Sequence, residues 1–528
     1  MAAQDNGGSK RQINPWLIAF TVSLATFMEV MDTSIANVSL RYIAGSVGAD
    51  QSESTWVLTS YLVSNAIVVP ISGWLASVIG RKRFYMICVA LFTLSSFACG
   101  LSISLGMLLT CRVIQGIGGG GLAPSEQAIL ADTFPPEKRG MAFAAYGVAV
   151  VVAPAIGPAL GGWITDTYSW RWIFFINIPV GIISLIMTYF LVQESPASKK
   201  EHEKAVKGGI KVDYVGFALV ALGLGCLQVV LDKGQEDDWF GSAFITTFAI
   251  LSVIGMVGGV IWELYGTKNP IVDLPMMKDR SFLFTAIMMF ITFFILQSTT
   301  QMLPQFVQQL LPYDATNAGL TLMLGGFVMM VLMPFIGILV RKVQPKYLIA
   351  FGFIVLSCAM RYLATFNSNV SFQVVVMGRV FQACGMAFLF VPIQTLAYAG
   401  LPKEKSNSAS ALINLMRNLG GSVGISMATT MLARRSQIHQ DRVVSSLTPT
   451  ALHFQSFVHS VADRFVGYGV DSVSAMKRAT FIVAREVNTQ STMLAYLDIF
   501  IVLMYGSLIA AMLTPFLKKI DLKKASAH

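Results

Sequence analysis

Apolar residues along the chain gather into long runs that are separated by short polar segments. Fourteen runs reach about 20 residues or more, enough for a helix to cross the roughly 30 Å hydrocarbon core of a membrane. The predicted spans are 15–38, 55–77, 84–104, 107–131, 141–164, 171–193, 213–232, 242–262, 281–303, 317–340, 347–366, 372–399, 408–432 and 493–516. The pattern therefore predicts an all-α polytopic membrane protein.

The spacing of these runs predicts how the chain is organised. Six spans precede residue 194 and six follow residue 280, with two extra spans between them. The expected segments are a cytoplasmic N-tail at 1–14, a six-helix bundle at 15–193, a linker with two transmembrane helices at 194–280, a second six-helix bundle at 281–516 and a cytoplasmic C-tail at 517–528. The second bundle includes a long polar segment, 434–490, whose partly amphipathic sequence favours short helices outside the membrane. That segment is either a solvated connection or a docking surface for a periplasmic partner.

Composition agrees with a membrane protein. Hydrophobic residues make up 55% of the chain and charged residues only 12%, against about 25% charged residues in soluble proteins. So few charges cannot cover several water-soluble cores. Nucleic-acid binding, a disulfide-rich secreted fold and a disordered scaffold are disfavoured, although the net charge is +10.

Lysine and arginine are divided unevenly between the two sides of the predicted membrane. With the N-terminus placed inside, the inner segments hold 24 of these residues, whereas the short outer loops hold only Arg41, Arg171 and Lys233. Short loops rich in Lys and Arg stay in the cytoplasm, while long loops such as 434–490 translocate largely regardless of charge. We therefore expect both termini in the cytoplasm.

An internal repeat connects the two predicted bundles at an offset of 267 residues. The sequence RVIQGIG at 112–118 recurs as RVFQACG at 379–385, and FPPEKRG at 134–140 recurs as LPKEKSN at 401–407. Five positions coincide at this offset, including Arg112 with Arg379. Both copies run from outside to inside, so the repeat is parallel, as in transporters built from repeated bundles.

Two acidic side chains in the first span are candidates for proton coupling. Glu29 and Asp32 are three residues apart, which places them on one helix face. Charged side chains inside a membrane span are costly and therefore indicate function. Two carboxylates this close in a low-dielectric cavity cannot both ionise easily, so one of them is expected to take up and release a proton. The alternative is a pair near the helix end that is bathed in water.

The fourth span places Arg112, Gln115 and Glu126 along one helical stripe. Glu126 lies 14 residues from Arg112, about 21 Å along the helix, so the two do not pair directly. Arg112 is either an electrostatic partner of the membrane carboxylates or the anchor of a buried hydrogen-bond network. The four glycines at 118–121 favour close helix contact, and without a G-K-[ST] ending they are not a phosphate loop.

Two further motifs indicate conformational elements. The fifth span contains APAIGPALGG at 153–162, where proline removes backbone donors and glycine admits a neighbouring helix. Between the second and third spans, GWLASVIGRKR at 73–83 ends in a tight basic turn suited to closing the inner mouth. The residues singled out in these motifs are Gly73, Gly80, Arg81, Lys82, Pro154, Gly157, Pro158, Gly161 and Gly162.

Taken together, these stretches resemble the major facilitator superfamily, and within it the fourteen-span drug:proton antiporters of the EmrB/QacA type, with the EmrB-like multidrug efflux proteins closest. VMDTSIANVSL is similar to the acidic motif of the first span, GWLASVIGRKR to the inner-loop motif, RVIQG to the fourth-span motif and GPALGG to the antiporter signature. The resemblance covers nearly the whole chain.

The resemblance implies a major facilitator fold of two six-helix bundles plus two central helices, in the bacterial inner membrane. It also implies that Asp32 takes part in proton coupling, that Arg112 supports it and that 153–162 helps to seal the bundle. A periplasmic adaptor and an outer-membrane channel are implied as possible partners, and 434–490 would suit such docking. One departure is Ser77, where the inner-loop motif usually has an acidic residue, so the charge contact there would be weaker or supplied from elsewhere.

The expected function is proton-driven export of amphipathic or hydrophobic compounds across the bacterial inner membrane, as the inner-membrane part of a tripartite pump. Membrane lipids and small amphipathic drug-like substrates are the expected partners. Met and Phe are abundant, at 27 and 35 residues, and supply adaptable apolar walls. The polar candidates for contact with substrate are Asn37, Gln115, Gln297, Gln301, Gln382, Asn414 and Arg417.

Other function classes have less support in the sequence. A symporter or an exporter for one metabolite or a fatty acid would use the same fold, although the fifth-span pattern argues against symport. A membrane enzyme would need a catalytic constellation, and neither H-E-x-x-H nor G-x-S-x-G occurs. Metal-spaced His and Cys clusters and a nucleotide-binding loop are also missing, so we expect no metal, no cofactor besides protons as the coupling ion, and no nucleic-acid partner.

Overall fold

The fold is that of a computed structural model, which describes residues 14–207, 213–267, 270–311, 313, 315–399, 401–447 and 452–517. Within these ranges the chain is helical and has no strand. The helices of the N-terminal half are α1 (Pro15–Val47), α2 (Gln51–Ile79), α3 (Arg81–Gly100), α4 (Leu105–Thr133), α5 (Pro136–Thr167), α6 (Trp172–Phe175) and α7 (Asn177–Leu191). The linker holds α8 (Pro196–Lys207), α9 (Tyr214–Lys233), α10 (Ala243–Ile261) and the short turns η1 (Trp239–Gly241), η2 (Trp262–Gly266) and η3 (Leu274–Lys278).

The C-terminal half contains longer helices. They are α11 (Arg280–Leu310), α12 (Ala315–Leu339), α13 (Pro345–Leu363), α14 (Phe372–Ala397), α15 (Ser406–Ser446), α16 (Leu452–Gly467) and α17 (Ser472–Leu513), with the short turns η4 (Lys403–Lys405) and η5 (Thr514–Phe516). Helix ends follow local chemistry. Asp50 and Glu53, for example, form a capping box at the start of α2, which satisfies backbone donors that the first turn leaves unpaired.

Thirteen segments of the described chain are long and apolar enough to cross a membrane, so the protein is a multi-pass membrane protein. The remaining predicted span, 408–432, lies in α15, which packs inside the bundle against α2, α4 and α11. The mean hydropathy of this helix is too low for it to be counted as a span, because it carries buried polar side chains such as Ser410, Asn414 and Arg417. The predicted span 171–193 is divided at Ile176 into α6 and α7.

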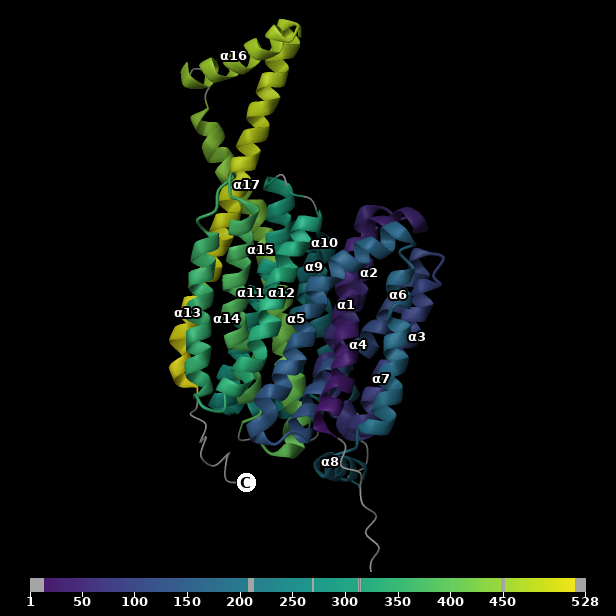
Figure 1. The fold of residues 1–528 in the computed structure, drawn as a ribbon. Helices are drawn as coiled ribbons and strands as arrows, with labels where there is room; N and C mark the ends of the chain where they lie inside the picture. Colours follow the sequence, from purple (N-terminus) through teal and green to yellow (C-terminus); the bar gives the residue numbers. More distant parts are fainter. Residues whose placement is uncertain are drawn as a thin grey trace, which may run out of the picture.

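The helices run side by side through one bundle, with α8 at one end and α16 at the opposite end (Figure 1). The two halves meet where α5 packs against α12 and α14, and where α2 packs against α15. The extra helices α9 and α10 pair with each other, and α9 also contacts α2 and α15. Of the two extra helices predicted between the bundles, α9 therefore lies against both halves.

The predicted soluble segment is helical and projects from the bundle. α15 and α17 continue beyond the other helices, and α16 lies across their ends (Figure 1). Val458 and Ala462 of α16 pack with Ala475, Ala479 and Val483 of α17 in a small apolar core. The segment predicted to form short helices holds α16, and α15 and α17 extend into it from the bundle.

Candidate functional site

A cavity of about 520 Å³ lies between the two halves. It is lined by residues of α1, α2, α4, α5, α9, α11, α12, α14 and α15, and apolar side chains alternate in its wall with many polar and several charged ones. Four of the predicted substrate-contacting residues line it: Asn37, Gln297, Gln301 and Arg417. A chamber that combines apolar surfaces with polar and charged groups suits amphipathic ligands.

Asp32 lies at the centre of a buried hydrogen-bond network beside this cavity. Its Oδ2 accepts a bond from Nη1 of Arg112 at 2.6 Å, and its Oδ1 accepts bonds from Gln115 at 3.0 Å and Asn177 at 2.7 Å. Asp32 is 2% exposed and Arg112 is fully buried, with its guanidinium 4.5 Å from the ring centre of Tyr61. Both expected roles of Arg112 therefore apply, since it pairs with a membrane carboxylate and anchors a buried network. Gln115, predicted to contact substrate, is instead committed to Asp32.

Glu29 occupies a different environment one helical turn away. It lines the cavity, and its Oε1 accepts bonds from Asn65 at 3.2 Å and Tyr61 at 3.4 Å. Its Oε2 is buried without a hydrogen-bond partner among the described residues. Tyr61 contacts both Glu29 and the guanidinium that pairs with Asp32, so the two carboxylates are joined through one side chain rather than directly.

Glu126 is fully buried farther along α4. Its Oε1 accepts a bond from Ser23 at 2.6 Å, and its Oε2 has no partner in the described chain. It does not line the cavity. The structure therefore places the three predicted carboxylates in three separate settings, of which only Glu29 faces the chamber.

The repeat-related residues of the C-terminal half form a similar network without a carboxylate. At the offset of 267, Thr299 of α11 stands where Asp32 stands in α1. Gln382 donates a hydrogen bond to Thr299, and Arg379 donates to Gln382 at 2.8 Å and to Thr300 at 3.3 Å. Gln382 is thus buried in this network and does not line the cavity, whereas Arg379 does.

The remaining predicted substrate contact, Asn414, is not at the cavity either. It is fully buried and exchanges hydrogen bonds with Gln127 at 2.8 and 3.3 Å, which joins α15 to α4 across the two halves. Arg417, one turn farther along, donates to the hydroxyl of Tyr146 and lies 5.7 Å from the ring centre of Phe293.

The end of the bundle near α8 is closed by a second polar cluster. Arg81 pairs with Asp132 at 2.5 Å and donates to Asn407 of α15 at 2.6 Å. Asn407 in turn donates to Glu201 of α8 at 3.0 Å. Burial raises the pKa of Glu201 to about 7, and the nearby Arg81 charge opposes that shift. The basic turn that follows Ser77 thus meets two carboxylates that other helices supply.

The motif glycines other than Gly162 lie close to atoms of another helix or of a neighbouring segment. A Cβ on Gly73 would be 2.9 Å from the backbone oxygen of Asn407, and Gly80 has a φ of +92°, which favours glycine. Gly157 and Gly161 lie against Ser34 and Ile35 of α1, whereas Gly162 has open space around it.

The other motif residues also make interhelical contacts or lie inside a helix. Lys82 donates to the backbone oxygen of Tyr189 at 2.7 Å, and the backbone oxygen of Pro154 accepts a bond from Ser34 at 3.3 Å. Pro158 lies inside α5, as does Pro154.

Comparison with known proteins agrees with this arrangement. Residues 22–425 match the model of the Major Facilitator Superfamily. The chain belongs to this superfamily. It is 39% identical over 446 residues to the "Multidrug export protein EmrB" of Haemophilus influenzae, covering 84% of this chain and 86% of the relative. It is 36% identical over 485 residues to the protein of the same name from Escherichia coli K12, covering 92% and 91%.

Solved structures of the superfamily agree in fold. The proton:xylose symporter XylE is 14% identical, with a TM-score of 0.62 over 97% of this chain and 98% of that chain. At this identity the likeness concerns the fold alone. This member of the major facilitator superfamily is thus a transporter by family.

Several site residues of this transporter were missed by sequence reasoning. Asn177 could have been found as an amide inside the sixth span, because a buried amide needs partners. Asp232, at the end of α9, lines the cavity and accepts a bond from Thr59. Tyr61 and Asn65 carry no charge, so a search for charged residues inside spans does not reveal them.

Proposed function

We propose that this protein exports amphipathic, largely apolar compounds across a bacterial inner membrane in exchange for protons. The observation that carries the proposal is the position of Glu29, a buried carboxylate with one oxygen that has no partner in the described chain and that lines the cavity beside the Asp32 network. Both similar proteins named above are called multidrug export proteins, which supports the same substrate class.

In the proposed cycle, protons compete with the Arg112 guanidinium for the Asp32 carboxylate. In the structure, the cavity lies between the two halves, and the hydrogen bond from Arg81 to Asn407 joins the halves at the end of the bundle near α8. A proton entering at Glu29 and passing to Asp32 would neutralise the partner of Arg112 and weaken that ion pair. Loss of the pair frees α1 to move relative to α4, after which the proton is released on the cytoplasmic side as the next substrate binds.

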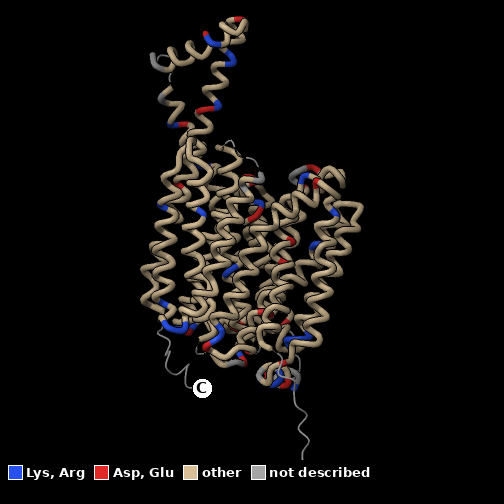
Figure 2. Tube along the Cα trace, viewed as in Figure 1, with Lys and Arg blue, Asp and Glu red and all other residues tan. Residues whose placement is uncertain are grey.

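The proposed orientation puts both termini in the cytoplasm. Lys and Arg gather at the end of the bundle where α8 lies (Figure 2), in agreement with the preference of these residues for the cytoplasmic side. α16 and the outer parts of α15 and α17 are then in the periplasm.

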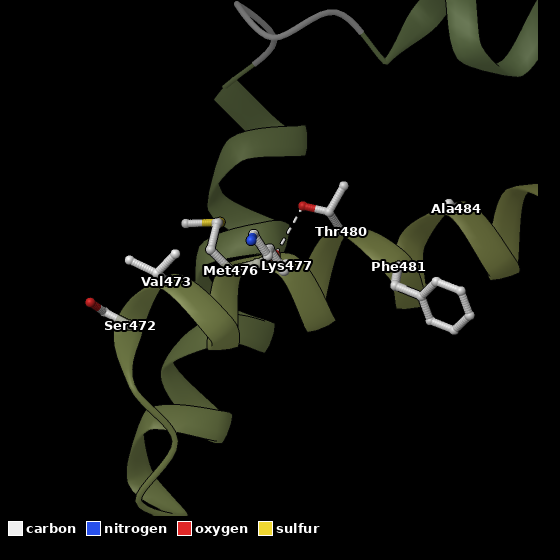
Figure 3. Close-up of a pocket in the computed structure, with 7 residues that line it drawn as sticks. All are labelled: Ser472, Val473, Met476, Lys477, Thr480, Phe481 and Ala484. Atoms are coloured by element: carbon white, nitrogen blue, oxygen red, sulfur yellow. Dashed lines mark hydrogen bonds between the residues drawn. The ribbon is translucent and has the colours of Figure 1, made fainter.

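We also propose that this projecting segment docks a periplasmic adaptor that leads to an outer-membrane channel. α17 presents Val473, Met476, Lys477 and Phe481 along a shallow surface groove (Figure 3). Phe481 is 70% exposed and Val473 is 65% exposed. Apolar side chains so exposed outside the membrane favour a protein partner. Replacing Phe481 by Glu should abolish co-purification of a periplasmic adaptor from the source cells, whereas unchanged co-purification would refute docking at this groove.

Transport itself is tested in proteoliposomes with an imposed pH gradient. The parent protein should accumulate an amphipathic dye against its gradient, and Asp32→Asn should reduce accumulation to the level of empty vesicles. Asp166→Asn is the matched control, because Asp166 bonds Tyr42 at an exposed position outside the network. Equal accumulation by the parent and Asp32→Asn would remove Asp32 from the mechanism.

A further inference from the structure

Arg379 is a buried cation at the cavity wall without a counter-charge in the described chain. It is 8% exposed, and no carboxylate of the described residues lies within 4.0 Å of its guanidinium nitrogens. Its bonds to Gln382 and Thr300 use two of five N–H donors, and Nε has no partner among the described residues. Gly325 of α12 makes room for it, since a Cβ there would be 2.7 Å from Cγ of Arg379.

The internal repeat shows what is missing around Arg379. Its counterpart Arg112 has the same glutamine three residues later and a carboxylate, Asp32, on the first helix of its half. The first helix of the C-terminal half carries Thr299 at that position, which offers no charge. Burying a guanidinium without an anion is costly. Arg379 is buried without an anion among the described residues, whereas its repeat counterpart Arg112 is neutralised by Asp32. This contrast indicates that the counter-ion of Arg379 is a bound molecule rather than a residue of the protein.

The surroundings of Arg379 determine what kind of anion fits. Leu296 and Phe293 of α11, Leu322 of α12 and Ile425 of α15 line the same cavity, so an apolar body can lie beside the charge. Thr300, which accepts from Arg379, is seven residues along α11 from Phe293, which packs under Arg417. Seven residues span about 10 Å of helix, so the two arginines do not grip one small group together.

We propose that Arg379 forms a subsite for the anionic head group of an amphiphilic substrate, a carboxylate attached to an apolar tail. The tail lies along the apolar wall toward Arg417. The inference rests on the proposed export function and narrows its substrate class. Carboxylate binding to a guanidinium in a water-poor site gives two charge-assisted hydrogen bonds, which Nε and Nη2 of Arg379 have the capacity to donate.

The test uses two fluorescent probes with the same pyrenyl-butyl tail, one ending in a carboxylate and the other in a trimethylammonium group. Binding to the full-length protein in lipid nanodiscs is measured first, without any gradient. Arg379→Gln should weaken binding of the carboxylate probe about tenfold or more, a change of about 1.4 kcal/mol or more, and leave the cationic probe unchanged. Arg379→Lys should retain most carboxylate binding. Arg361→Gln, at an exposed position of α13, is the matched control and should change neither probe.

A second variant tests the same idea without removing the arginine. Thr299→Asp recreates the N-terminal pairing and should weaken the carboxylate probe as much as Arg379→Gln does. Equal weakening of both probes by Arg379→Gln would show a merely structural role and overturn the subsite. So would unchanged carboxylate binding in Thr299→Asp, provided that its melting temperature matches the parent.

Two further arms distinguish an amphiphile subsite from a site for a free inorganic anion, and binding from export. Exchange of gluconate for inorganic phosphate at constant ionic strength should leave carboxylate-probe binding in place, and its full loss would assign the site to a free inorganic anion. Gradient-driven export of the bound probe in proteoliposomes tests the export function separately. Arg379-dependent binding without export would refute the proposed function while keeping the subsite.

Discussion

The two halves of this transporter build the same buried motif and fill it differently. In each half an arginine is followed three residues later by a glutamine to which it donates a hydrogen bond, through Arg112 and Gln115 in one and Arg379 and Gln382 in the other. The glutamine then donates to the first helix of its half, where the acceptor is Asp32 in α1 but Thr299 in α11. The N-terminal half therefore holds a buried ion pair. The C-terminal half holds a buried arginine that pairs with no carboxylate among the described residues.

This difference separates two tasks that the proposed proton-driven exporter would combine. In the proposed cycle, the carboxylate that exchanges its proton belongs to the N-terminal half, where Tyr61 joins its partner Arg112 to Glu29 at the cavity. Arg112 and Arg379 both line the cavity, but only Arg112 is paired with a carboxylate among the described residues, so the unpaired positive charge belongs to the C-terminal half. The internal repeat gives both sites a similar geometry, and the different residues at the position of Asp32 and Thr299 give them different chemistry.

The largest expected difference between the halves is in stability. Arg112→Met leaves Asp32 buried without its counter-charge and should cost about 3–5 kcal/mol. Arg379→Met removes an unpaired buried charge and should be neutral or stabilising. Thermal unfolding of the two purified variants in the same detergent measures this. Equal destabilisation by both would mean that Arg379 has a counter-charge in the protein and that the halves are alike.

A second difference concerns glycines that the repeat also relates. Gly157 of α5 faces the side chain of Ser34, whereas Gly424 of α15, at the same offset, faces the backbone oxygen of Phe294. Gly424→Ala should therefore cost about 1–3 kcal/mol, because a backbone cannot move aside easily. Gly157→Ala should cost less, since the Ser34 hydroxyl can rotate away and only a small shift of α1 is then needed to clear the Ser34 Cβ at 2.7 Å. Gly162→Ala should cost nothing, because nothing lies within 4 Å of its added Cβ. The melting temperatures of the three variants should therefore fall in the order Gly162→Ala, Gly157→Ala, Gly424→Ala. A Gly157→Ala variant less stable than Gly424→Ala would contradict this account.

The smallest expected effect lies where α8 joins the halves at the closed end. The pKa of Glu201 is raised from 4.5 to about 7, so the folded state holds its proton more tightly than the unfolded chain does. Stability should therefore fall as pH rises from about 4.5 to 7. Because solvent screens the partly exposed Glu201 carboxyl, the expected loss in the free energy of unfolding is about 1 kcal/mol. Glu201→Gln should flatten this part of the melting profile, while Glu203→Gln, on the exposed side of α8, should leave it unchanged. A profile unaltered by Glu201→Gln would exclude this carboxyl as the source.

Much of the fold follows from the sequence because membrane burial imposes long apolar runs. Thirteen spans, the family and the burial of the Asp32 and Arg112 charges inside the bundle could all be predicted in this way. The exception among the spans is instructive. α15 carries Asn414 and Arg417 on a face that is covered by the other half, so its polarity reflects a protein interface rather than water.

The site was harder to predict because partners come from distant parts of the chain. Gln115, Gln382 and Asn414 are polar and intramembrane, as a substrate-binding residue would be, yet each is used in a buried network. Whether a polar side chain faces a cavity or another side chain depends on helix rotation and packing, which hydropathy does not encode. The role of α9 in the cavity wall was missed for the same reason.

The most direct test of proton coupling is the release of protons when substrate binds. In weakly buffered detergent solution near neutral pH, an amphiphile that binds the parent protein should acidify the medium, because binding and protonation of the Glu29 and Asp32 sites exclude each other. Asp32→Asn should bind the same amphiphile and release markedly fewer protons. Undiminished proton release from Asp32→Asn would contradict the account, because the buried carboxylate paired with Arg112 would then have no part in exchange.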